Sequence, residues 1–250
     1  MWRVTLAVGI ALLAGCSGVF PAGSTTDGSD PVTPAPVPTD SPDETVPVPT
    51  SDGRVDVDRL LERHEQALAT RSFHRHVEQA GPQNTLDVWI DRQRGVQRVQ
   101  RRFGPISDDV VFADGTVYTN VRDDPDTPYA TTPATENTSL VASPAGVDLL
   151  RQLLSNTAYR KVDSARWRGR PVAVLAATDT VETPTAENES RVGRSRLYVD
   201  RQGIIRHVEH TEQRPERPDI DTTMTVTTDI DRVPIPWWLE DNDPYSSGST

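Results

Sequence analysis

Two stretches of the sequence, VWIDRQRGVQRV at residues 88–99 and LYVDRQGIIRHV at residues 197–208, resemble each other and decide the fold. Each begins with alternating residues that include an aromatic side chain. An Asp-Arg-Gln turn containing glycine follows, and then the alternation resumes. Side chains alternate between the two faces of a strand and glycine permits a tight turn, so each stretch predicts a β-hairpin.

Antiparallel strands are predicted in further segments of the chain. Asp114-Gly115 is a strong hairpin-turn signal, because both residues tolerate a positive φ angle. Residues 123–142 and 180–193 are rich in Pro, Thr, Asn and acidic residues and are predicted to be loops. Residues predicted to share a strand face are Leu86, Val88 and Ile90; Val117, Thr119 and Val121; and Met224, Val226, Thr228 and Ile230.

Two helices are predicted, one before the strands and one among them. Residues 55–70 place Val57, Leu60, Leu61, His64 and Leu68 on one helical face, with Asp56 or Asp58 as the N-cap. Residues 143–156 form the second helix, with Ser143 as the N-cap and Pro144 in its first turn. Its apolar stripe consists of Val147, Leu150, Leu153 and Leu154.

The first residues of the sequence are predicted to be an export signal. Residues 4–13 form an apolar run that is too short to span a bilayer, which takes about 20 residues. Leu-Ala-Gly-Cys at residues 13–16 resembles the lipobox of prokaryotic lipoproteins. The resemblance implies that residues 1–15 are a signal peptide, and that Cys16 becomes the lipidated first residue through a diacylglycerol thioether. An ordinary signal peptide, or a short buried helix, with an incidental cysteine is the alternative.

The mature chain divides into three parts by composition. After Cys16, residues 17–53 are rich in Pro, Thr, Ser and Asp and contain no basic residue, so we predict a disordered linker over 16–53. Residues 54–238 form the folded domain, in which Trp237 and Trp238 pack back on the strands. Residues 239–250 are predicted to be a disordered tail.

The charge balance favours an acidic surface. The formal net charge is −11, and Lys161 is the only lysine. This composition is typical of proteins from high-salt cells, although arginine-rich codon usage together with an acidic linker is an alternative. An acidic chain is a poor partner for nucleic acid, because phosphate contacts need basic patches.

The order of these elements resembles the LolA/LppX-like lipoprotein carriers. The order is anchor, linker, helix, antiparallel strands, central helix and more antiparallel strands. The resemblance also rests on the two hairpins quoted above and on RWRGRPVAVLAA at residues 166–177. It covers roughly residues 55–235, and uncharacterised surface lipoproteins of halophilic archaea are built in the same way. It implies an α+β fold in which a curved antiparallel sheet, a half-barrel, holds both helices on its concave face. The low content of apolar residues argues against a large apolar cavity.

Catalytic and metal-binding patterns are weak. His74 and His76 share a strand face, whereas His207 and His210 lie on opposite faces of theirs, so surface histidines are favoured over a transition-metal site. No cofactor, metal or enzymatic activity is expected. Asn137 and Asn188 begin glycosylation sequons, which also arise by chance in chains rich in Ser and Thr.

The sequence favours a binding function on the outer face of the cell membrane. The predicted protein is a monomeric, lipid-anchored lipoprotein that binds or carries a lipid or other amphiphile. A hollow of the sheet would contact the apolar chain through Trp89, Phe103, Tyr118, Leu150, Leu153 and Leu154. The alternative is a protein-interaction module or an accessory subunit of an envelope complex, without a small-molecule ligand. A filled core with one exposed apolar patch would favour that alternative.

Overall fold

A computed structural model describes residues 45–120, 129–135, 138–155, 157–180, 191–214, 216–242 and 245. The chain separates into two units, residues 1–40 and residues 41–250, and the description below concerns the second. Cys16, Asn137 and Asn188, together with the signal peptide and most of the linker, lie outside the described residues. The predictions for them remain predictions.

Strands dominate the described part of the chain. Two helices and one 3₁₀ segment accompany them: α1 (Val57–Ala69), α2 (Val147–Leu154) and η1 (Trp237–Asn242). The strands are β1 (Thr50–Ser51), β2 (Arg54–Val55), β3 (Phe73–Gln79), β4 (Asn84–Asp91), β5 (Val96–Phe103), β6 (Ile106–Ala113), β7 (Thr116–Asn120), β8 (Tyr129–Pro133), β9 (Thr157–Trp167), β10 (Arg170–Thr180), β11 (Arg191–Asp200), β12 (Ile205–Gln213) and β13 (Ile220–Thr227).

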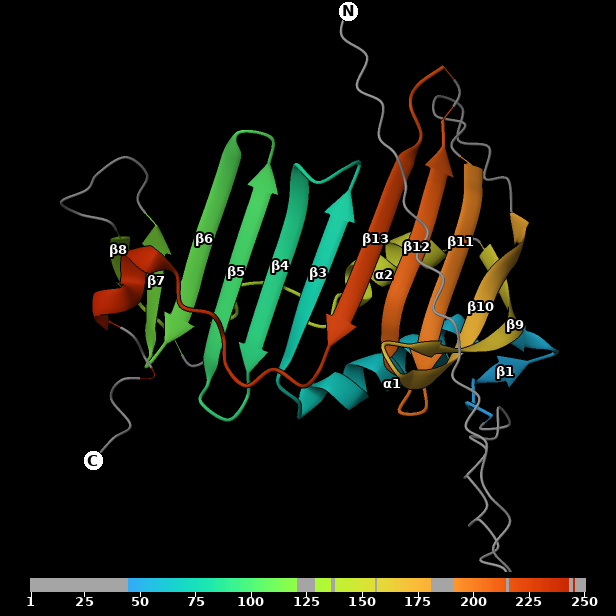
Figure 1. The fold of residues 1–250 in the computed structure, drawn as a ribbon, viewed down its shortest axis with the longest axis horizontal. Coiled ribbons are helices and arrows are strands. Elements are labelled where there is room, and N and C mark those ends of the chain that lie inside the picture. The colour runs from blue at the N-terminus through green and yellow to red at the C-terminus, as the bar shows by residue number, and fades with distance from the viewer. Residues whose placement is uncertain are drawn as a thin grey trace, which may run out of the picture. The chain divides into compact units, whose positions relative to one another are not determined.

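Eleven of the strands form a single antiparallel sheet in the order β8-β7-β6-β5-β4-β3-β13-β12-β11-β10-β9. The sheet does not close, because β8 and β9 lie at its two ends (Figure 1). Strands β3 and β13 are neighbours although they are far apart in sequence, so their pairing joins the two halves of the sheet. The predicted fold class, an open antiparallel sheet with one N-terminal and one central helix, is confirmed.

The two quoted stretches are hairpins, as predicted, and their shared aspartate has the same role in both. Asp91 Oδ1 accepts hydrogen bonds from the backbone N–H groups of Gln93 and Arg94, at 3.0 and 3.2 Å. Asp200 Oδ1 accepts the corresponding bonds from Gln202 and Ile204, at 2.8 and 3.0 Å. The aspartate therefore satisfies the backbone donors of the turn.

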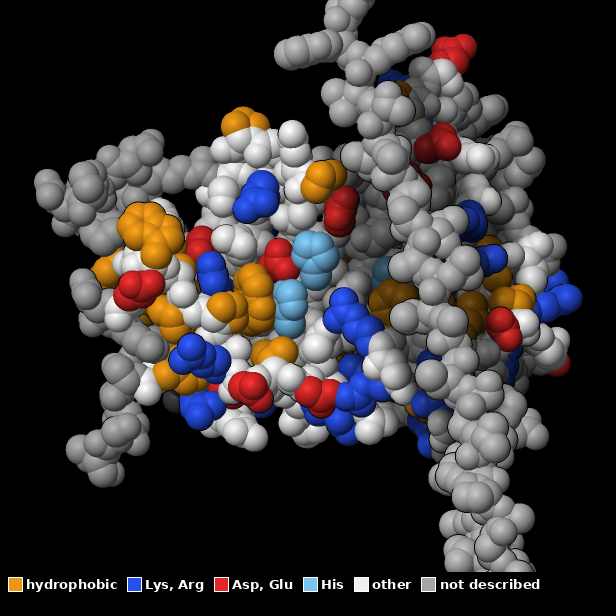
Figure 2. Space-filling view, in the orientation of Figure 1, with side chains coloured by type: hydrophobic (Ala, Val, Ile, Leu, Met, Phe, Trp, Pro, Cys, Tyr) orange, Lys and Arg blue, Asp and Glu red, His pale blue; other side chains and the backbone are white. Residues whose placement is uncertain are grey.

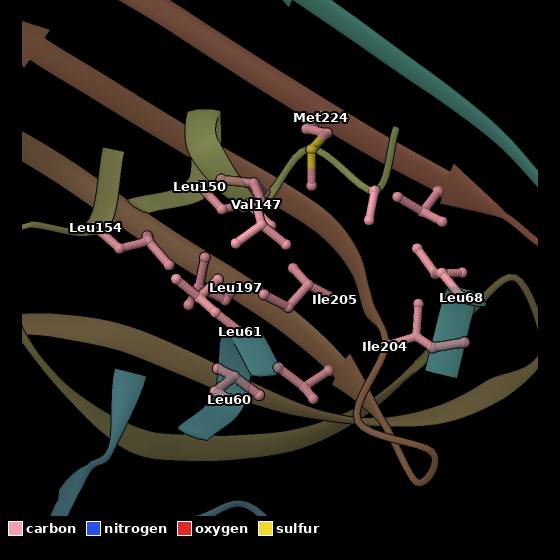
Figure 3. Packing of buried hydrophobic residues seen from close by; sticks show 14 of the residues in the cluster. Leu60, Leu61, Leu68, Val147, Leu150, Leu154, Leu197, Ile204, Ile205 and Met224 are labelled. Carbon is pink, nitrogen blue, oxygen red and sulfur yellow. The ribbon is translucent and has the colours of Figure 1, made fainter. Parts of the chain in front are cut away.

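Both helices pack on the same face of the sheet, which we call the helix-side face. Figure 1 shows α1 and α2 behind the strands that run from β3 to β9. Apolar side chains of both helices meet those of the sheet in one core, and Figure 3 shows leucines from α1 and α2 pointing toward Leu197, Ile204 and Ile205. The core is filled where the two helices lie.

The N-cap of α1 is as predicted, whereas the start of α2 differs. Asp56 caps α1 by accepting a hydrogen bond from the N–H of Arg59 at 3.1 Å. Helix α2 begins at Val147 and not at residue 143, so Ser143 is not its N-cap. Residues 143–146 form a turn closed by the N–H of Gly146 on the Ser143 carbonyl at 2.9 Å, and Gly146 has a φ of +82°.

Other segments also differ from the sequence-based expectation. The prediction places residues 45–53 in the linker, but Val46 is buried in the core and β1 pairs with β2. Strand β8 lies within a stretch predicted to be a loop, and β13 ends at Thr227, before Thr228 and Ile230. The prediction places residues 239–242 in the tail, but Leu239 is buried. Trp238 packs on the sheet as predicted, whereas Trp237 is 76% exposed. These segments are short, and sheet or core contacts far away in sequence hold them.

Candidate functional site

The helix-side face carries an apolar strip beyond the helices. The strip lies on β5, β6 and β7, where neither of the two described helices covers the sheet (Figure 1). Two of its side chains are more than half exposed, and three are half-buried and belong to neither of the two apolar cores of the described chain. The strip consists of Phe103, Ile106, Val110, Phe112 and Val117.

Register shows why these side chains share one face. Phe112 pairs with Val117 on one side and with Gln97 on the other, and Gln97 pairs with Ile90 in the main core. Residues that are directly opposite in an antiparallel pair point to the same face. The strip is therefore a lateral continuation of the core that neither described helix covers, and the paired Arg101 and Asp108 separate Phe103 and Ile106 from its other three residues.

A buried arginine lies on the same face as the strip, with β4 between its strand and β5. Arg75 of β3 is only 4% exposed, and its Nη1 donates a hydrogen bond to the Ser143 carbonyl at 3.0 Å. Burial lowers the pKa of Arg75 to about 10. Its Nε and the Oγ of Ser143 are both buried and have no hydrogen-bond partner.

The imidazole of His64, a neighbour of Arg75, already has hydrogen-bond partners at both nitrogens. His64 of α1 accepts a hydrogen bond from the Ile205 N–H at its Nδ1, 3.1 Å away, which leaves Nε2 to donate to the Ala145 carbonyl at 3.0 Å. Burial lowers the pKa of His64 to about 4, although the hydrogen bond to the Ala145 carbonyl acts in the opposite direction and raises it. His64 is therefore neutral near neutral pH and supplies no charge beside Arg75.

The other face of the sheet, here called the open face, carries two stacks of rings. Figure 2 shows histidine side chains near the middle of this face, next to apolar ones. In the first stack, the His74 ring is parallel to the Trp89 ring, with their centroids 4.6 Å apart. The guanidinium carbon of Arg98 lies over the same Trp89 ring, 5.1 Å from its centroid. In the second, His207 stacks on Trp167 at 4.3 Å, beside Tyr198.

Asp87 links His74 of the first stack to His76, which lies on the same strand and face. Its Oδ1 lies 2.7 Å from Nε2 of His74 and 2.8 Å from Nδ1 of His76. Burial would raise the pKa of Asp87, but the hydrogen bonds with the two histidines lower it below its ordinary value. Among the residues that the structure describes, no group of three or more His, Cys, Asp or Glu side chains could hold a metal ion.

The C-terminal segment covers one end of the open face. Arg98 and Asp109 form a bidentate ion pair at 2.8 and 2.7 Å, and the Trp238 Nε1–H donates to Asp109 at 3.2 Å. A hollow of about 390 Å³ lies between η1 and strands β5–β7. Most of the residues that line it are polar, among them Gln100 and Asn120. The exposed Trp237 also lines it.

The structure does not bring the six predicted ligand contacts together. Leu150, Leu153 and Leu154 are buried in the core between α2 and the sheet, and Phe103 lies in the apolar strip. Trp89 and Tyr118 lie on the open face, packed against a second core under η1. The strand alternation could have shown this for Trp89. Neighbours in a strand point to opposite faces, so Trp89 points away from the face on which Ile90 and the leucines of α2 pack.

No family model and no curated protein matches the sequence. Solved structures that it resembles include LprF from Mycobacterium bovis, with 12% identity, 72% of this chain and 95% of that chain covered, and a TM-score of 0.41. A LolA superfamily protein from Nitrosomonas europaea matches with 9% identity, 68% and 91% coverage, and a TM-score of 0.24.

A third similar structure is a complex of MucA and MucB from Pseudomonas aeruginosa. It matches with 19% identity and a TM-score of 0.35, and the match covers 72% of this chain and 59% of that chain. The structure itself shows the element order on which the predicted resemblance to LolA/LppX-like carriers rests: a helix, antiparallel strands, a second helix and further antiparallel strands in one open sheet.

Proposed function

We propose that this protein is an extracytoplasmic, lipid-anchored binding protein that holds the apolar chain of an amphiphile on the apolar strip. The strip is the observation that carries the proposal. Phe103 and Ile106 are 54% and 55% exposed, and the strip adjoins a core that is otherwise filled. Covering such a surface with a hydrocarbon chain gains about 25 cal/mol per Å² of apolar area removed from water.

Two observations support this assignment. The helices pack on the core over β3, β13 and β12, whereas the apolar side chains of the strip belong to neither core of the described residues. The Leu-Ala-Gly-Cys stretch at residues 13–16 resembles a lipidation signal.

The test is binding of the neutral apolar fluorophore N-phenyl-1-naphthylamine to the purified protein. We expect its fluorescence to rise with wild-type protein and the affinity to fall in the Ile106→Ser and Phe112→Ser variants. Val162→Ser is the matched control, because Val162 is also 55% exposed but lies on β9. Absence of binding to the wild type, or equal loss in the control, would exclude the proposal.

The second candidate is a protein-interaction module that uses the open face. Trp237 favours it, because a 76% exposed tryptophan beside a polar hollow is an uncommon surface feature. A photo-crosslinking amino acid placed at position 237 should then capture a defined envelope protein in intact cells. The same substitution at position 162 is the control, and equal capture at both positions would contradict this function.

A further inference from the structure

Arg75 is a buried cation without a carboxylate partner among the residues that the structure describes. Its guanidinium donates one hydrogen bond, to the Ser143 carbonyl, and its Nε donates none. The only influence that shifts its pKa clearly is burial, and none comes from a carboxylate among the described residues. Burying a charge without a partner carries the full desolvation cost of the ion, so a buried charge normally has a counter-charge or a bound ligand.

The contrast with the other buried arginines is sharp. Arg98 and Arg206 are 8% and 2% exposed, and each faces an aspartate at 2.7 Å, Asp109 and Asp200 respectively. These two cations are neutralised within the fold. Arg75 is as deeply buried and has a carbonyl oxygen in place of a carboxylate.

The surroundings of Arg75 add positive potential. A Cβ atom built on Gly146 would lie only 2.3 Å from Nη1 of Arg75, so the guanidinium packs against the residue that precedes α2. Gly146 has no side chain to cap the helix, and the N-terminus of a helix carries a partial positive charge. Asp148 lies in the first turn, but its side chain is 69% exposed and lies 3.7 Å from Arg151.

A second polar atom beside Arg75 also lacks a partner. The Oγ of Ser143 is buried and makes no hydrogen bond, although the carbonyl of the same residue accepts from Arg75. A hydroxyl and a guanidinium Nε–H are both donors to an anionic oxygen. The two atoms are closed off from solvent, so binding of an anion there requires the turn at residues 143–146 to move.

We propose that Arg75, Ser143 and the N-terminus of α2 form a binding site for an anionic oxygen group, such as a carboxylate or a phosphate. The proposal rests on the proposed function in one respect: Arg75 lies on the same face as the apolar strip, in the register row Arg75, Val88, Val99 and Val110, so the anion is the head group of an amphiphile whose chain runs across this row to the strip. The ligand class is therefore an anionic, single-chain or multi-chain amphiphile.

The experiment compares three probes on the full-length protein at equal ionic strength. Laurate carries a chain and a negative charge, dodecyl maltoside carries the same chain without charge, and inorganic phosphate carries charge without a chain. Thermal midpoints and dissociation constants are measured for wild type, Arg75→Met and Ser143→Ala. Arg102→Met is the control, because Arg102 is an exposed arginine at the end of β5.

We expect wild type and the control to bind laurate roughly tenfold or more tightly than dodecyl maltoside, the size of one charge-assisted hydrogen bond. Arg75→Met should abolish this preference and bind both amphiphiles equally. Ser143→Ala should reduce the preference, and it provides a readout if Arg75→Met does not fold.

Equal binding of both amphiphiles by wild type, or an unchanged preference in Arg75→Met, would overturn the anion site and leave the proposed function intact. Stabilisation by phosphate that depends on Arg75, without binding of either amphiphile, would support the anion site and exclude the amphiphile. Failure of all three probes to bind wild type would overturn both proposals.

Discussion

At the scale of single residues, His64 links three parts of the fold. Its ring lies fully buried on the inner face of α1 and bonds the backbone of Ile205 on β12 and of Ala145 in the turn before α2. The sequence places His64 on the apolar face of a helix but does not reveal either bond, because both partners are more than 80 residues away. A neutral imidazole suits this position, since it donates through one nitrogen and accepts through the other.

We predict that His64 makes stability depend on pH. The pKa of His64 is lowered from 6.5 to about 4 in the folded protein, so the unfolded chain binds the proton more tightly. The contribution of His64 is therefore complete above about pH 6.5 and is lost as the pH falls toward about 4, by about 3 kcal/mol in total. Urea unfolding of wild type and His64→Leu between neutral pH and about pH 5 measures how the free energy of unfolding changes over the upper part of this pH range.

The variant sets the expected difference. At neutral pH, His64→Leu should be less stable, because the Ile205 N–H and the Ala145 carbonyl lose their partners at about 1–3 kcal/mol each. As the pH falls, the gap between wild type and variant should narrow, since only the wild type pays for protonation. Parallel curves at every pH would show that His64 does not titrate in this way.

At the scale of elements, the two similar hairpins differ in what their aspartates hold. Asp200 also pairs with the buried Arg206 at 2.7 Å, whereas Asp91 pairs with Arg94, whose side chain is 52% exposed, at 3.3 Å. Loss of a buried partner leaves an uncompensated charge, while loss of an exposed one leaves a solvated arginine.

We therefore predict that the two hairpins tolerate the same substitution unequally. Asp200→Ala should lower the free energy of unfolding by about 3–5 kcal/mol, because Arg206 then stays buried without its counter-charge. Asp91→Ala removes similar turn hydrogen bonds but should cost clearly less. Urea denaturation of both variants is the measurement, and equal losses would show that the turns, and not the buried pair, dominate.

Helix α2 offers the second prediction at this scale. Leu153 is 9% exposed in the core between α2 and the sheet, so Leu153→Ala should cost roughly 2–5 kcal/mol, the range for a packed leucine. Binding of the apolar fluorophore to the strip should be unchanged, because the strip lies on β5–β7. A small loss of stability with altered binding would instead place Leu153 at the wall of a ligand cavity.

At the scale of the whole molecule, the charge of −11 sets the response to salt. If the acidic surface is an adaptation to high salt, repulsion among carboxylates destabilises the domain in dilute buffer. We expect the thermal midpoint to rise with KCl, because the Debye length falls to about 3 Å at 1 M. A midpoint that stays flat or falls would favour codon usage as the origin of the composition.

The membrane anchor is the other whole-molecule prediction. The sole cysteine, Cys16, follows Leu-Ala-Gly and lies outside the described residues. Native protein should partition into detergent, and Cys16→Ser should either release it or leave an unprocessed precursor. Radiolabelled acyl-chain incorporation and detergent partitioning measure this, and wild-type behaviour in the variant would exclude lipidation at Cys16.

The sequence by itself determined the hairpins at residues 88–99 and 197–208, the helix beginning after Asp56 and the apolar stripe of α2. These features depend on alternation, periodicity, turn residues and caps, which act between residues a few positions apart. The resemblance to LolA/LppX-like folds followed from the order of those elements. The start of α2 was misplaced because Ser143 and Pro144 mimic a helix start within a turn closed at Gly146.

Only the tertiary structure decided which side chains meet. The pairing of β3 with β13 places Arg75 in a core where no described carboxylate pairs with it, and it places the His74 and His207 stacks on one open face. Neither of the two described helices covers the strip on β5–β7. These arrangements depend on strand order and on where the helices end, and contacts between residues far apart in the chain fix both, so no local pattern encodes them.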